Sequence, residues 1–238
     1  MKQAELLIHA DADDLAYDVA SRFITRVVDA QSTGGVAHVV LTGGRVAAVV
    51  YRAVAESPAR NQIDWQRVEF WWGDERFLPD GDPDRNETQA REALLSHLDV
   101  DPARVHPMPA DTGQGAEAAA AAYAEELAAA GSPKFDVLML GVGPDGHVAS
   151  LFPGYPQLEV LDAAAVAVHD SPKPPPTRVS LTFPRLDRSR EVWFVVSGED
   201  KADAVAQALS GGDVPAAHAK GQDRTLWLLD QAAASKLS

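Results

Sequence analysis

The sequence contains no cysteine, which excludes disulfides, thiolate nucleophiles and thiolate metal ligands. No stretch approaches the ~20 apolar residues needed to cross a bilayer, and residues 1–10 carry one Lys without the long apolar run of a signal peptide. Basic residues are also few, with 21 Lys and Arg against 35 Asp and Glu and a formal net charge of −14. Nucleic acids and anionic membranes are bound through clustered basic residues, so we expect neither as a partner. We expect a soluble, cytoplasmic protein.

Short apolar runs alternate with amphipathic segments along the 238 residues, 46% of which are hydrophobic. The runs predict strands near residues 6–8, 36–42, 68–72, 105–108, 136–140, 164–168, 178–182, 191–197 and 225–229. The segments between them predict helices near 15–27, 46–56, 84–97, 116–130 and 199–209. This alternation indicates an α/β fold with a mostly parallel sheet that is covered by helices on both faces. We expect residues 1–238 to form one domain.

A glycine-rich loop follows the apolar run at 136–140 and presents one imidazole, that of His147, with Asp145 two residues earlier. Ligands of open α/β sheets lie at the carboxyl ends of strands, and histidine is the side chain best suited to proton transfer near neutral pH. Asp145 could orient it. The alternative is a tight turn with an idle surface histidine. The loop is not a Rossmann fingerprint, because Pro144 removes an amide donor.

Metal and nucleophile motifs are weak in this chain. The seven histidines are scattered without metal-ligand spacing, so we expect no metal site. Ser150 lies three residues after His147 but outside any Gly-x-Ser-x-Gly elbow. We therefore expect Ser150 to cap a helix or loop and His147 to act on water.

Other strand ends collect glycines and charged side chains, namely Gly43, Gly44, Asp74, Arg76 and Lys201, with Arg45 directly after the two glycines. The strand–Gly-Gly–helix junction points amide groups and a helix dipole at one spot, which suits a phosphate or is simply a tight turn. Arg45 either adds a charge there or faces solvent. A cation in the first turn of a helix, such as Lys201, is disfavoured unless an anion is bound nearby.

The proline-rich segment 171–178 is stiff and leads directly into a strand, so it favours a rigid active-site loop over a linker or a peptide ligand. Together with the strand-end cations it predicts a rim that binds a small anion such as a sugar phosphate.

Four motifs resemble the signatures of 6-phosphogluconolactonases: GVGPDGHVASLFP at 141–153, GDER at 73–76, KPPPTRVS at 173–180 and GEDKA at 198–202. The resemblance extends from about residue 36 to 229. It implies a Rossmann-like, doubly wound fold shared with sugar-phosphate isomerases and deaminases. It also implies hydrolysis of 6-phospho-D-glucono-1,5-lactone to 6-phospho-D-gluconate, in the oxidative pentose phosphate pathway, without a cofactor. Many members read Gly-Gly-Ser-Thr-Pro where this chain has Gly43-Gly44-Arg45-Val46-Ala47, so the hydroxyls of that motif are missing.

The resemblance suggests roles for the candidates. His147 would be the general base, oriented by Asp145 or Asp74, and amides of Gly43-Gly44 or of residues 143–146 would stabilise the oxyanion. The phosphate would be held by cations of the rim, namely Arg76, Arg178 and Lys201.

Two other functions stay open: glucosamine-6-phosphate deamination or sugar-phosphate isomerisation, and sugar-phosphate sensing without catalysis. The residues after His147 are unlike the Ile-Ala-Phe-Asn-Glu-Pro run of the deaminases, and the deaminase Asp-Glu-Tyr is replaced by Asp74-Glu75-Arg76. We expect a phosphosugar lactone as the small-molecule partner and a monomer or weak homo-oligomer. A functional link to glucose-6-phosphate dehydrogenase stays open.

Overall fold

The computed structural model describes residues 4–237, so residues 1–3 of the segment considered as a signal peptide lie outside it. Its centre is a six-stranded sheet in the order β1-β9-β8-β5-β2-β3. Every neighbouring pair in this sheet is parallel. The strands are β1 (Glu5–His9), β2 (Ala37–Leu41), β3 (Val68–Trp72), β5 (Phe135–Leu140), β8 (Ser189–Val196) and β9 (Arg224–Asp230). The predicted α/β class and parallel sheet are confirmed.

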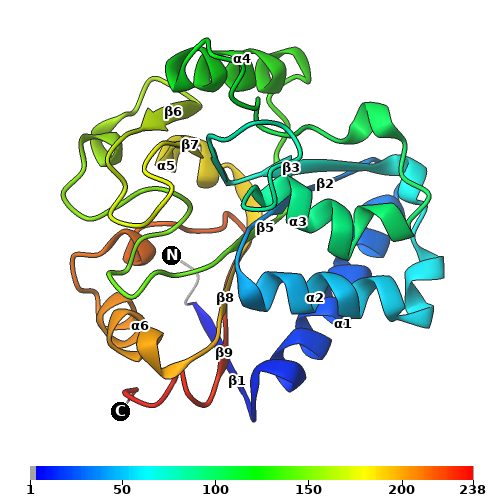
Figure 1. Ribbon diagram of the computed structural model, residues 1–238. Helices are drawn as coiled ribbons and strands as arrows, with labels where there is room; N and C mark the ends of the chain where they lie inside the picture. Colours follow the sequence, from blue (N-terminus) through cyan, green and yellow to red (C-terminus); the bar gives the residue numbers. More distant parts are fainter. Residues whose placement is uncertain (1–3, 238) are drawn as a thin grey trace.

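Helices cover both faces of this sheet. The α-helices of the described chain are α1 (Ala12–Gln31), α2 (Arg45–Glu56), α3 (Asn86–Ala93), α4 (Ala116–Ala129), α5 (Phe183–Leu186) and α6 (Ala202–Leu209). Helix α4 packs mainly on residues 165–168, outside this sheet. In Figure 1, α1 and α2 lie to the right of the strands β8, β9 and β1, and α6 lies to their left. None of the helices within residues 4–237 combines the length and apolarity that a bilayer span requires.

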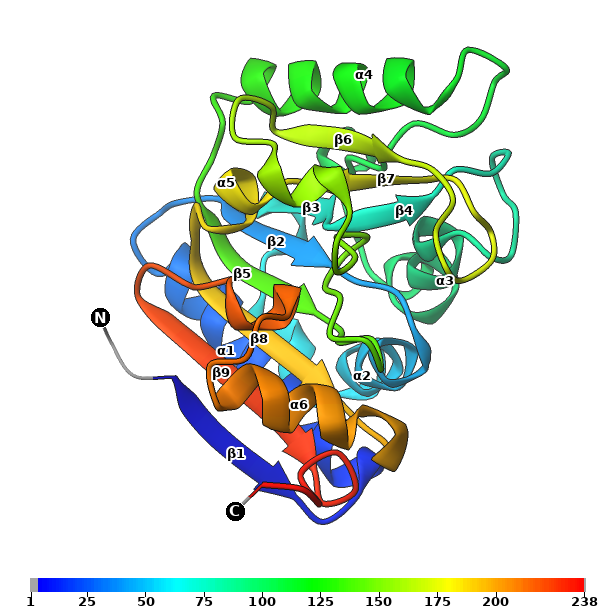
Figure 2. The same ribbon diagram turned by 90° about the vertical axis from the view of Figure 1, so that its left-hand side faces the viewer.

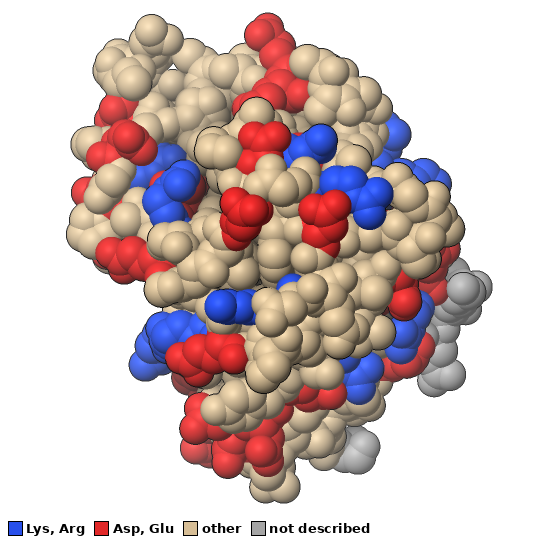
Figure 3. All heavy atoms as spheres, turned by 90° about the vertical axis from the view of Figure 1, so that its right-hand side faces the viewer, with Lys and Arg blue, Asp and Glu red and all other residues tan. Residues whose placement is uncertain are grey.

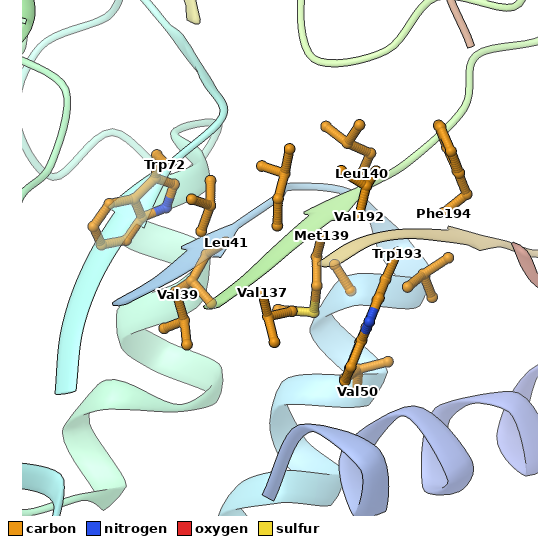
Figure 4. Packing of buried hydrophobic residues seen from close by; sticks show 14 of the residues in the cluster. Val39, Leu41, Val50, Trp72, Val137, Met139, Leu140, Val192, Trp193 and Phe194 are labelled. Atoms are coloured by element: carbon orange, nitrogen blue, oxygen red, sulfur yellow. The ribbon is translucent and has the colours of Figure 1, made fainter. Parts of the chain in front are cut away.

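The strands are buried because their residues are apolar on both faces. All six residues of β5 are buried. Side chains alternate between the faces along each strand, as Figure 4 shows for Val137, Met139 and Trp193 on the side of Val50, and for Leu140, Val192 and Phe194 on the other. Helix α1 buries one side. The apolar residues at four-residue spacing that predicted it are all buried, namely Leu15, Val19, Phe23 and Val27.

A second, antiparallel sheet of three strands was not predicted from the sequence. It has the order β4-β7-β6, with β4 (Asp74–Arg76), β6 (Ala165–Val168) and β7 (Arg178–Leu181). Figure 2 shows it beside α4, above the main sheet. Gly73 joins the two sheets: its N–H donates to the carbonyl of Leu41 at 3.2 Å, and its carbonyl accepts from the N–H of Leu181 at 2.9 Å. The predicted strands at 164–168 and 178–182 are therefore real, but they belong to this smaller sheet.

Two local predictions were wrong. The helix expected at 84–97 is shorter and runs from Asn86 to Ala93, and the carboxylate of Glu75 accepts the N–H groups of Asn86 and Glu87 at 2.6 and 2.9 Å. A carboxylate from a distant strand thus replaces the local cap. The strand expected at 105–108 is reduced to one isolated bridge between Val105 and Phe70.

Candidate functional site

A cavity of about 610 Å³ opens at the carboxyl ends of β2, β5 and β8, where the loops and the smaller sheet meet. Strand ends of α/β sheets are the usual place for ligands. Eight of the nine predicted site residues line it: Gly43, Gly44, Arg45, Asp74, Arg76, His147, Arg178 and Lys201. The ninth, Asp145, contacts His147 directly. The fold therefore brings together residues that are up to 158 positions apart, from Gly43 to Lys201.

His147 and Asp145 form a hydrogen-bonded pair, with 2.5 Å between the imidazole Nδ1 and the carboxylate Oδ1. The ring of Phe152 lies 4.5 Å from the imidazole ring, centre to centre, and fixes its other side. Because an ionised carboxylate accepts the Nδ1 proton, the second nitrogen, Nε2, is the basic one in the neutral ring. Within residues 4–237, Nε2 has no hydrogen-bond partner.

The ionised form of Asp145 is favoured by its surroundings. Burial opposes its ionisation, but the hydrogen bond and the charge of His147 outweigh burial and lower the pKa of Asp145 to about 2. Asp145 is therefore a carboxylate over the whole range in which proteins work. It can hold the neutral imidazole in one tautomer.

Glycine at position 143 is required for this pair. A Cβ added to Gly143 would lie 2.0 Å from His147 Nδ1 and 2.5 Å from Asp145 Oδ1. The amides of Gly143 and Gly146 donate to the carbonyls of His147 and Gly143, both at 2.9 Å. These two amides hold the loop together and already have acceptors, so within residues 143–146 the predicted arrangement would depend on the amide of Asp145.

The other arrangement, at Gly43 and Gly44, is compatible with the structure. Gly44 precedes α2 with a φ of +103°, a conformation that favours glycine. The amides of Gly43 and Gly44 donate no hydrogen bond within the described part of the chain. Gly43 packs so closely on Asn86 that an added Cβ would lie 1.8 Å from its Oδ1.

Asp74 is buried beside the cavity and is held by two polar side chains. Ser150 Oγ donates to its Oδ2 at 2.7 Å, and Asn86 Nδ2 donates to its carbonyl at 2.9 Å and to its Oδ1 at 3.4 Å. Ser150 is fully buried, so its expected role as a cap was wrong. Asp74 makes no hydrogen bond to His147 in residues 4–237, which leaves Asp145 as the partner of the imidazole.

The cations of the rim differ in what they already bind. Lys201 Nζ lies 2.8 Å from Asp200 Oδ2, and Arg76 donates to the carbonyl of Asp84. Arg178 is buried, which lowers its pKa, and its Nε and Nη2 donate to carbonyls of the proline-rich loop at 2.8 to 3.2 Å. Arg178 therefore holds that loop as well as lining the cavity.

Arg76 and Arg178 are directly opposite each other on the antiparallel strands β4 and β7. Like charges in such positions destabilise a sheet. An anion between them would remove this cost. The arrangement thus favours an anionic ligand on this wall of the cavity.

Two polar residues of the cavity wall were missed from the sequence, Asn86 and Lys173. Lys173 is half-buried in the cavity, and burial, together with the charge of Lys201, lowers its pKa. Its place within the KPPPTRVS motif was the available signal. Among residues 4–237, no group of three His, Cys, Asp or Glu is arranged to hold a metal ion.

Comparison with known proteins shows the family of this chain. The family model for glucosamine-6-phosphate isomerases/6-phosphogluconolactonase matches residues 10–227. The chain is 56% identical to 6-phosphogluconolactonase of Streptomyces coelicolor, over 98% of this chain and 94% of the relative. It is 47% identical to that of Mycobacterium tuberculosis, over 97% of both chains. The crystal structure of 6-phosphogluconolactonase from Thermotoga maritima superimposes with a TM-score of 0.86 at 29% identity, covering 96% of this chain and all of the other. The chain therefore belongs to the glucosamine-6-phosphate isomerase/6-phosphogluconolactonase family, and it is an enzyme of the lactonase type.

Proposed function

We propose that this lactonase hydrolyses 6-phospho-D-glucono-1,5-lactone to 6-phospho-D-gluconate, the second step of the oxidative pentose phosphate pathway, with His147 as the general base. The observation that carries the proposal is the His147–Asp145 pair on a cavity whose other walls bear Arg76, Lys173 and Lys201. One part of this cavity can move a proton and another can hold a phosphate.

The reaction begins with a water molecule hydrogen-bonded to Nε2 of His147. Nε2 takes a proton from this water as its oxygen attacks C1, and the C1 carbonyl oxygen becomes an oxyanion. Asp145, held ionised, stabilises the imidazolium that forms. The amides of Gly43 and Gly44 are the donors we assign to the oxyanion.

The tetrahedral intermediate then collapses. The C1–O bond to the ring oxygen breaks, and the Nε2 proton passes to that oxygen as it leaves as the C5 hydroxyl. The new carboxylic acid loses its proton to solvent, and His147 returns to its neutral form. A δ-lactone is an activated ester, so these steps require only water and side chains of this chain.

The phosphate positions the lactone against His147. Arg76 and Lys201 are the side chains we assign to it, with Lys173 and Arg45 beside them. Asp74 acts differently: its charge favours the charged form of Arg178 against the effect of burial on that guanidinium. Binding energy from the phosphate then holds C1 near the base.

His147→Asn tests the proposal, with His169→Asn as control, because His169 is exposed, lies outside the cavity lining and pairs with Glu117. With fresh lactone and spontaneous hydrolysis subtracted, we expect His147→Asn to lose roughly 10²–10⁴-fold in kcat. It should still bind 6-phosphogluconate, and His169→Asn should resemble the wild type. Full activity of His147→Asn would refute the base assignment. Ammonia release from glucosamine 6-phosphate without lactone hydrolysis would instead favour the deaminase activity.

A further inference from the structure

A second cavity, of about 730 Å³, lies between α2 and α3 and is larger than the first. The two cavities share Gly44, Arg45 and Arg76, so the second is continuous with the part of the active site to which we assign the phosphate. The proposed hydrolysis uses no other residue of the second cavity. The remaining length of this groove therefore needs a separate explanation.

The groove exposes guanidinium groups without partners. Arg45 and Arg52 are seven residues apart on α2, which is two helical turns, so both point to the same side. Ala48 lies between them and leaves the wall open. Neither guanidinium makes a hydrogen bond or ion pair with another described residue, although Arg60 and Arg76 donate to backbone carbonyls.

The charge of the groove changes along its length. Gly43 packs against Asn86, so α2 and α3 both begin at the active site, next to Arg45 and Arg76. Glu56 and Glu92 lie at the other ends of these helices, and both line the groove. Figure 3, which faces the side of the helices α1 to α3, shows basic and acidic side chains interspersed there. Asp84 also lines the active-site end and Arg60 the far end, so the active-site end carries two arginines against one carboxylate and the far end two carboxylates against Arg60.

We propose that this groove is a second anion subsite that takes linked phosphate groups, as in an inorganic oligophosphate or a nucleoside polyphosphate. One end of the phosphate chain lies at Arg76 and Arg45, and the other end extends along α2 toward Arg52. Guanidinium groups suit such ligands because each can donate two hydrogen bonds to one phosphate. The inference rests on the proposed function only in placing the phosphate of the substrate at Arg76. A ligand in this groove would cover the substrate's phosphate position and so inhibit the enzyme.

Calorimetric titration with tripolyphosphate and with orthophosphate, in buffer free of divalent cations, tests this without any turnover. Arg52 is exposed and lines only the second cavity, so Arg52→Gln should fold and keep its kcat. We expect tripolyphosphate to bind the wild type at least roughly tenfold more tightly than orthophosphate. Arg52→Gln should lower the affinity for tripolyphosphate by roughly tenfold, the effect of one charge-assisted contact. It should change the affinity for orthophosphate by less than about twofold.

Glu92→Gln is the matched variant of opposite sign in the same groove. This variant should bind tripolyphosphate roughly twofold more tightly, because it lacks a surface charge that repels the ligand. Equal effects of Arg52→Gln on both anions, or on neither, would overturn the proposal. A comparison of the affinities for pyrophosphate and ADP then shows whether the groove prefers a free phosphate chain or a nucleotide. If the protein did not hydrolyse the lactone, only the proposed function would be refuted, because these titrations measure binding and not turnover.

Discussion

Removing the hydroxyl of Ser150 should destabilise the protein more than removing an equally buried hydroxyl elsewhere. Ser150 Oγ donates to Asp74 Oδ2 at 2.7 Å, with Ser150 0% and Asp74 7% exposed. A buried hydrogen bond to a charged group contributes about 1.5–3 kcal/mol, against about 0.5–1.5 kcal/mol for a neutral pair. Ser150→Ala should therefore lower the free energy of unfolding by about 1.5–3 kcal/mol.

Ser189→Ala is the control, because Ser189 is also 0% exposed and its Oγ donates at the same 2.7 Å, to the neutral carbonyl of Leu186. Urea denaturation followed by circular dichroism should show a loss of only about 0.5–1.5 kcal/mol for this variant. In an Asp74→Asn background, the cost of Ser150→Ala should fall to that of the control, which a double-mutant cycle measures. The reasoning is refuted if Ser150→Ala costs no more than Ser189→Ala in the wild-type background.

Three further predictions concern the site and its supports. Gly143→Ala should separate His147 from Asp145, because the new methyl group overlaps both, and kcat should fall at least tenfold while the far-ultraviolet spectrum is unchanged; unchanged kcat would contradict this. Lys201→Ala should raise KM strongly, and a loss confined to kcat would argue that Lys201 acts on the transition state instead. Burial raises the pKa of Glu75 to about 7 from 4.5, against the effect of Arg85, so its stabilising contribution is complete below pH 4.5 and is lost as pH rises through 7. In urea denaturation, the free energy of unfolding of Glu75→Gln should therefore rise relative to that of the wild type by up to about 3 kcal/mol between pH 4.5 and pH 8. A difference that does not change with pH would refute the assignment.

Local patterns were sufficient for the buried strands and for the loop. The five residues of β3 coincide with the predicted run at 68–72, because a strand buried on both faces is apolar throughout. The His147 loop was recognisable because glycines and a charged pair follow such a strand without interruption. Arg45 and Lys201 could be placed at the same rim because they follow β2 and β8, and parallel strands end on one side. Arg76 and Arg178 lie on the antiparallel sheet, so this argument does not place them.

The rest depends on contacts between residues distant in sequence. Strand β4 has only three residues, all charged, and it exists because β7 pairs with it. The cap of α3 comes from Glu75, eleven residues before Asn86. Ser150 and Asn86 are ordinary polar residues until the fold places them on either side of Asp74. No periodicity or spacing indicates such pairs.

The peptide at Gly73 has a mechanical consequence. Its N–H belongs to the ladder of the large sheet and its carbonyl to that of the small one, so the two sheets share one residue and no linker separates them. A twist of either sheet must pass through this point, and Asp74 is the next residue along the chain. A substitution that tilts the small sheet, even one far from the cavity, should therefore move the Asp74 carboxylate rather than be absorbed by a flexible connection. The position of Asp74 in the cavity wall therefore depends on how rigidly the Gly73 peptide is held by its two hydrogen bonds.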